Sequence, residues 1–166
     1  MADAAWEQRV QALWSAYDDL DEATFVAAMD ALCAELPSGH GAAEALYERG
    51  SAFDSTGRPD QAVPLYRAAL DAGLGEDRRR PAVIQLASSL RNLGRASEAV
   101  ALLSVERDVT HDDLDDAVAA FLALALADDG REREGVATAL GALARHMTRY
   151  RRSLTAYAEE LVEPPA

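Results

Sequence analysis

A glycine-containing turn recurs three times in this 166-residue chain, and its spacing constrains the fold more than any other feature. The turns are Thr56-Gly57-Arg58, Leu93-Gly94-Arg95 and Asp129-Gly130-Arg131, whose glycines lie 37 and 36 residues apart. Five residues after each glycine stands a small residue: Ala62, Ala99 and Gly135. Repeats of this length are typical of helical solenoids, in which each helix pair buries its apolar face by stacking on the next pair.

The composition and the apolar spacing both predict helices between these turns. Alanine occurs 36 times and leucine 21 times, against ten valines and one isoleucine, which favours helix over strand. Apolar residues recur at helical intervals, as in Val83, Leu86, Ala87 and Leu90. Small residues such as Gly50, Ala62 and Gly135 should let the paired helices approach closely. We expect an all-α fold of about nine antiparallel helices joined by short loops.

The chain is expected to form one domain built from these helix pairs. Residues 43–72, 80–107 and 116–146 are the three predicted repeats. Residues 4–37 form an amphipathic helix pair without the turn glycine and are interpreted as a degenerate pair that precedes the repeats. Residues 148–163 carry one more apolar stripe, which predicts a C-terminal helix that caps the array.

The charge balance excludes several classes of partner. The chain has 29 acidic residues against 16 basic ones, a formal net charge of −13 and an isoelectric point near 4.5. A main partner of nucleic acid or anionic membrane would need a positive field instead. The longest apolar run, residues 117–127, is too short to span a bilayer, and no signal peptide pattern opens the sequence. We therefore expect a cytoplasmic protein.

The basic run Arg78-Arg79-Arg80 is interpreted as a solvated loop before a helix, with anion binding as the alternative.

Residues 43–72 carry the pattern of a known family. The segments Ala43-Glu-Ala-Leu-Tyr-Glu-Arg-Gly50-Ser-Ala-Phe53, Gly57-Arg-Pro-Asp-Gln-Ala62 and Tyr66-Arg-Ala-Ala69-Leu70 together resemble a tetratricopeptide repeat. Residues 80–107 and 116–146 resemble it more loosely, and the whole chain is similar to small bacterial tetratricopeptide repeat proteins. The resemblance implies a right-handed superhelix whose first helices line a concave groove for a protein or peptide partner.

Matching the repeats through their turn glycines gives the residues expected to line that groove. They are Tyr47, Glu48, Ser51, Asp54, Gln85, Ser88, Arg91, Asn92, Phe121 and Leu124. Some members of the family clamp a terminal carboxylate with cationic side chains. The matching positions here hold Tyr47, Ser51, Gln85, Ala117 and Phe121, none of which is a cation, so binding of that type is not expected.

Catalytic motifs are missing from the sequence. The three histidines are scattered, the glycine turns belong to the repeats, and the single cysteine, Cys33, is expected to be a small buried residue. We therefore predict no enzyme activity, no cofactor and no metal site.

The segment 117–127 is apolar all the way round, and such a helix is expected to be buried on every side. Either the C-terminal helix or a second subunit should then cover Phe121 and Leu124. The sequence thus favours a protein–protein interaction scaffold that binds a peptide or partner protein in its groove. The alternative is a self-associating module, a homodimer whose groove is covered by its own copy or by the C-terminal helix. The identity of the partner is not encoded in any motif.

Overall fold

A computed structural model describes residues 3–36, 41–109 and 111–163 of the chain. Within these ranges the protein consists of nine α-helices and one 3-10 helix, with no strand. The all-α prediction is confirmed. The helices group into two compact units, Met1–Ser89 and Leu90–Ala166, which we call unit 1 and unit 2. Pro37, the expected end of the N-terminal helix pair, lies outside the described residues.

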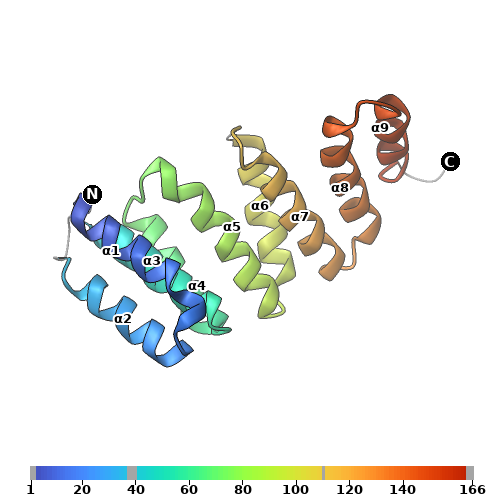
Figure 1. Ribbon diagram of the computed structural model, residues 1–166. Coiled ribbons are helices and arrows are strands. Elements are labelled where there is room, and N and C mark those ends of the chain that lie inside the picture. Colours follow the sequence, from blue (N-terminus) through green and yellow to red (C-terminus); the bar gives the residue numbers. More distant parts are fainter. Residues whose placement is uncertain (1–2, 37–40, 110, 164–166) are drawn as a thin grey trace. The chain divides into compact units, whose positions relative to one another are not determined.

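Unit 1 is built from antiparallel helices joined by short turns (Figure 1). In order these are α1 (Ala4–Ser15), the 3-10 helix η1 (Tyr17–Asp19), α2 (Glu22–Ala34), α3 (Ala42–Ser55), α4 (Pro59–Asp71) and the part of α5 (Glu76–Asn92) that reaches Ser89. Helix α3 packs against α4 and α2, and α2 packs against α1. The largest fully buried side chains of unit 1 are Trp6, Phe25, Met29 and Tyr66.

Unit 2 begins with the last turn of α5 and continues with α6 (Ala96–Val109), α7 (Asp115–Asp128), α8 (Glu132–His146) and α9 (Arg151–Glu160). Helix α7 packs against α6 and α8, and α9 packs against α8. Leu103, Val118 and Leu122 are fully buried.

The three glycine turns share one hydrogen-bonding pattern. Gly57, Gly94 and Gly130 have φ values of 69°, 71° and 77°, in the left-handed region where only glycine avoids a Cβ penalty. After each glycine, an arginine N–H donates to the carbonyl five residues earlier, as Arg58 does to Phe53 at 2.8 Å and Arg131 to Leu126 at 2.8 Å. This is the bond that closes a Schellman-type helix end, so each predicted turn terminates its helix as expected.

Close helix contact at the small residues is also confirmed. Ala62 and Ala99 are fully buried. A Cβ added at Gly50 would lie 2.9 Å from Cδ1 of Tyr66, and one added at Gly135 would lie 2.7 Å from the carbonyl oxygen of Ala123. In both pairs, α3 with α4 and α7 with α8, the glycine marks where the helices come closest.

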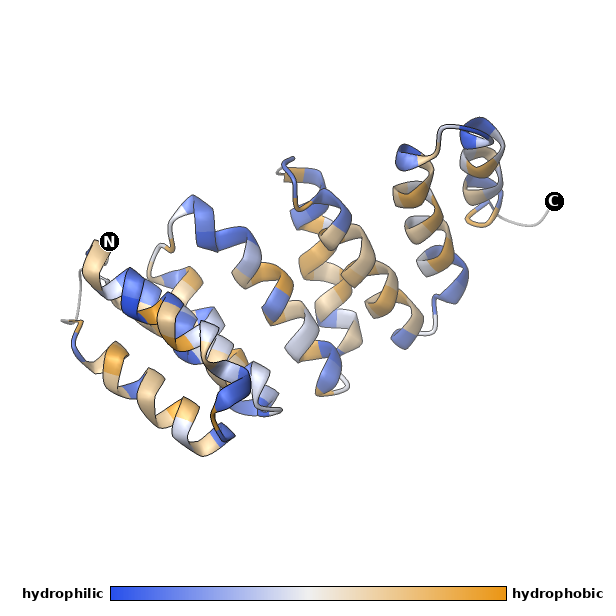
Figure 2. Ribbon diagram, viewed as in Figure 1, coloured by the Kyte–Doolittle hydropathy of each residue, from blue (hydrophilic) through white to orange (hydrophobic). Residues whose placement is uncertain are grey.

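A single chain does not bury α7 on every side, and covering of Leu124 by a second subunit stays a prediction. Figure 2 shows α7 as apolar along most of its length. Its buried residues lie on the faces toward α6 and α8, but Leu124 is 46 % exposed and Phe121 is half-buried. Helix α9 packs against α8, so Leu124 keeps its exposure.

Two glycines of α8 give a matched test of this packing. Replacing Gly135 with alanine should destabilise the fold by about 1–3 kcal/mol, because the new methyl group meets backbone rather than a movable side chain. Replacing Gly141 with alanine should instead stabilise it by about 0.5–1 kcal/mol, since nothing lies within 4 Å of the added Cβ and alanine is the better helix former. Thermal or urea denaturation followed by circular dichroism measures both. Equal effects of the two substitutions would contradict the close contact at Gly135.

Candidate partner-binding site

A cavity of about 460 Å³ lies within unit 1, between α1, α3 and α5. Its wall consists of aromatic, polar and charged side chains: Glu7, Val10, Gln11, Trp14, Tyr47, Glu48, Ser51, Ser55, Arg78 and Gln85. Four of the ten residues expected to line a groove, Tyr47, Glu48, Ser51 and Gln85, are therefore brought together here.

Helix α1 presents two faces that serve different purposes. Asp3 caps the helix by accepting a hydrogen bond from the Trp6 N–H at 2.8 Å. Trp6 is buried, and its indole N–H donates to the carbonyl of Leu32 at 2.9 Å, which fixes α1 to α2. Glu7 and Trp14 lie two turns apart on an adjacent face and enter the cavity wall.

Two hydrogen bonds of the same sequence spacing join successive helices around the cavity. The Trp14 indole N–H donates to Oε2 of Glu48 at 2.9 Å, and the Ser51 hydroxyl donates to Oε1 of Gln85 at 3.2 Å. Each bond spans 34 residues of sequence. The same 34-residue spacing therefore relates α1 to α3 and α3 to α5, and all three helices line the cavity.

Glu48 is the electrostatic centre of the cavity. Its side chain is only 6 % exposed, and Nε of Arg78 lies 3.3 Å from Oε1. Burial raises the pKa of Glu48 above its ordinary value, although the Trp14 and Arg78 hydrogen bonds act in the opposite direction. Arg78 also pairs with Glu7. Burial lowers the pKa of Arg78, but the hydrogen bond to Glu7 and the nearby carboxylates more than offset this, so the net change is a rise.

The other predicted groove residues lie outside the cavity. Asp54 is half-buried and accepts a hydrogen bond from the Ser89 hydroxyl at 2.7 Å, and burial raises its pKa. Ser88, which directly precedes Ser89 in the sequence, is also half-buried. The remaining four predicted residues belong to unit 2: Arg91, Asn92, Phe121 and Leu124. The Arg91 side chain there pairs with Asp128.

Sequence reasoning missed the contribution of α1 and of Arg78. The sequence does not place Trp14 in the site, because residues 4–37 lack the turn glycine through which the repeats are matched. The interpretation of Arg78 as part of a solvated loop is wrong. It lies in the first turn of α5, with a side chain 19 % exposed, because two carboxylates partner it there.

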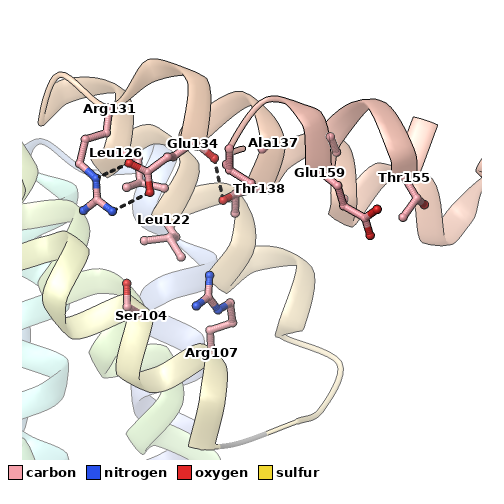
Figure 3. Close-up of a pocket in the computed structure, with 13 residues that line it drawn as sticks. Ser104, Arg107, Leu122, Leu126, Arg131, Glu134, Ala137, Thr138, Thr155 and Glu159 are labelled. Carbon is pink, nitrogen blue, oxygen red and sulfur yellow. Dashed lines mark hydrogen bonds and ion pairs between the residues drawn. The ribbon is translucent and has the colours of Figure 1, made fainter. Parts of the chain in front are cut away.

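A second cavity, of about 480 Å³, lies within unit 2 (Figure 3). Leu122 and Leu126 of α7 form part of its wall, and Thr155 and Glu159 come from α9. Two ionisable groups on α8 and its preceding turn, Arg131 and Glu134, pair with each other at 2.7 Å. The cavity contains none of the ten predicted groove residues.

Potential metal ligands and the single cysteine also occur in the described structure. No group of three or more potential metal ligands occurs among the described side chains. Cys33 is buried, and burial raises the pKa of its thiol to about 12, so the nucleophilic thiolate is scarce at neutral pH. No helix within the described ranges is long and apolar enough to cross a membrane.

Comparison with known proteins identifies the family. A family model for the tetratrico peptide repeat matches residues 43–161, which run from α3 through α9. The chain belongs to the tetratricopeptide repeat family, and the predicted helical-repeat fold is confirmed. Members of this family mediate protein–protein interaction and are typically non-enzymatic scaffolds. No curated protein and no solved structure matches the chain.

The buried carboxylate predicts a specific pH dependence of stability. The pKa of Glu48 is raised in the folded protein above its ordinary value of 4.5. At pH values between the ordinary pKa and the raised pKa, the folded state therefore holds more protons than the unfolded state. The free energy of unfolding therefore falls as pH rises through this window. Glu48→Gln removes that fall, and the difference in unfolding free energy, variant minus wild type, should increase between about pH 4, just below the ordinary Glu value, and about pH 7.

Glu35→Gln provides a control of opposite sign. A hydrogen bond from Arg9 lowers the pKa of the exposed Glu35 carboxylate, so its contribution to stability is present above the ordinary value and lost on acidification. For this variant the same difference should decrease as pH rises. Urea denaturation at several pH values measures both variants, and parallel pH profiles would contradict the assignment.

Proposed function

We propose that this protein is a scaffold that binds a segment of a partner protein in the cavity of unit 1. The observation that carries the proposal is the convergence of Tyr47, Glu48, Ser51 and Gln85 on one cavity. The repeat pattern predicts these four positions for the groove, and all four line this cavity. Its volume lies within the range of about 300–1,000 Å³ that is typical of ligand pockets, which suits side chains of an extended segment.

The composition of the wall supports recognition of a peptide. Trp14 and Tyr47 offer aromatic surface with polar tips, and residues of this kind dominate the energetics of protein interfaces. The amide of Gln85 offers a further polar group at the wall. The 3-10 helix η1, which follows α1, is tied to the end of α3, because the Tyr17 hydroxyl donates to the carbonyl of Ser55 at 2.6 Å. The walls are therefore held in place before a ligand arrives.

Selection from a phage-displayed library of random dodecapeptides tests this function. Peptides selected on the wild-type protein should bind Tyr47→Ala at least ten-fold more weakly, since the variant removes an aromatic wall of the cavity. Tyr157→Ala is the matched control, because Tyr157 is 61 % exposed on α9 in unit 2. Fluorescence anisotropy measures the affinities, and circular dichroism checks that both variants fold. Undiminished binding to Tyr47→Ala would exclude the cavity as the site.

A second function, self-association through α7, is favoured by one observation. Leu124 is 46 % exposed on a helix whose residues 117–127 are all apolar, with Phe121 half-buried one turn earlier. Contiguous exposed apolar surface of this kind is typical of interaction sites. A homodimer related by a two-fold axis would cover it on both copies.

Light scattering at micromolar to millimolar protein concentration tests this second proposal. The wild-type mass should approach that of a dimer, and Leu124→Gln should return it to the monomer value, because the substitution makes the contact polar. Val105→Gln is the matched control, since Val105 is 63 % exposed on α6 in the same unit. A wild-type protein that stays monomeric throughout would refute the dimer.

A further inference from the structure

The charges that line the unit 1 cavity do not balance. Glu7 and Glu48 face a single cation, Arg78, among the lining side chains. Nη1 of Arg78 also lies 3.7 Å from Asp77, so three carboxylates share one guanidinium. The excess negative charge is local as well as global, because residues 1–89 contain 15 acidic and 7 basic residues.

The carboxylate of Glu48 retains capacity for another donor. A carboxylate has about four acceptor positions, and Glu48 uses one on each oxygen, for Trp14 and for Arg78. Charge-assisted bonds between arginine and carboxylate are normally about 2.7–2.9 Å long, whereas the contact between Arg78 Nε and Glu48 is 3.3 Å. Burial makes incomplete pairing of such a group costly, so a cation that pairs with Glu48 more closely than Arg78 does would be strongly stabilised.

Aromatic and apolar wall residues suit the rest of a long basic side chain. Trp14 and Tyr47 line the same cavity as Glu48, and Val10 adds an apolar surface. A guanidinium or ammonium group near an aromatic face gains cation–π attraction, and its methylene stem packs against apolar surface. Arg78 lines the same cavity with a side chain only 19 % exposed.

We propose that the cavity recognises a basic side chain of the partner segment, an arginine or lysine, which inserts between Glu7 and Glu48 and displaces Arg78. This inference rests on the proposed binding function and adds the chemistry of the ligand. Arg78 acts in the free protein as an internal occupant that neutralises the two carboxylates. The excess acidic charge of unit 1 steers a basic segment toward the cavity.

The opposite assignment, in which Arg78 binds a carboxylate of the partner, places that carboxylate beside Glu7 and Glu48. Like charges at that range repel, most strongly where water is excluded. The cavity therefore favours a cationic ligand over an anionic one.

The dodecapeptides selected on the wild-type protein supply the probes. Selected sequences should be enriched in arginine or lysine, and replacing the critical arginine with citrulline, a neutral side chain of nearly the same shape, should weaken binding at least ten-fold. Where the critical residue is lysine, norleucine serves the same purpose. Fluorescence anisotropy at two salt concentrations measures each dissociation constant.

Protein variants locate the contact. Glu48→Gln preserves an acceptor for the Trp14 indole and should bind the basic and the neutral peptide almost equally. Glu22→Gln makes the same change in net charge at an exposed position on α2, and it should keep the full ten-fold discrimination. Arg78→Gln removes the internal occupant, so its affinity for the basic peptide should rise at least three-fold.

The outcomes separate this inference from the proposed function. Peptides that depend on Tyr47 but tolerate citrulline would overturn the inference and leave the binding function standing. Acidic peptides whose binding is lost in Arg78→Gln would overturn it in favour of carboxylate recognition. If no selected peptide depends on Tyr47, the proposed function itself fails. Should Arg78→Gln unfold, the comparison of Glu48→Gln with Glu22→Gln still decides the point, because both substitutions are isosteric.

Discussion

Close approach of the two helices in a pair is the constraint on which the rest of the structure depends. Gly50 leaves room for the ring of Tyr66, and Gly135 lets α8 approach the backbone of α7 at Ala123. Tyr66 is fully buried as a result, and its hydroxyl lies 3.4 Å from the hydroxyl of Ser51 in the cavity wall. The contact between α3 and α4 therefore sets the position of the residues that α3 presents on its other side.

The cavity of unit 1 depends on a polar cluster that the fold holds away from water. Glu48 is buried and, among the described residues, accepts hydrogen bonds from Trp14 and Arg78, and its raised pKa reflects the cost of that burial. Buried ion pairs are weak contributors to stability, because removing the charges from water offsets most of their attraction. The arrangement of Glu7, Glu48 and Arg78 is therefore better explained by ligand recognition than by stabilisation of the fold. This reasoning supports the proposed cationic ligand.

The sequence was sufficient for the fold but only in part for the site. Glycine periodicity located the turns, because a helix end in the left-handed region demands glycine wherever it occurs. The same periodicity placed Tyr47, Glu48, Ser51 and Gln85 on one side, since equivalent positions of a repeat face the same way. It did not extend to α1, whose turn lacks glycine. The sequence did not show which side of α7 a single chain leaves uncovered, because apolar composition raises the cost of exposure without fixing how many helices pack around it.

By itself, the sequence determined the helical class, the turn positions and the repeat family, since each follows from local backbone preference and from a period visible along the chain. Only the tertiary structure decided that Arg78 lies against Glu7 and Glu48 rather than in solvent. It also decided that the Trp14 indole N–H donates a hydrogen bond to the buried carboxylate of Glu48. These contacts join residues 71, 30 and 34 positions apart. Their partners are selected by which side chains the packed helices bring within hydrogen-bonding range, and no local rule of sequence specifies that choice.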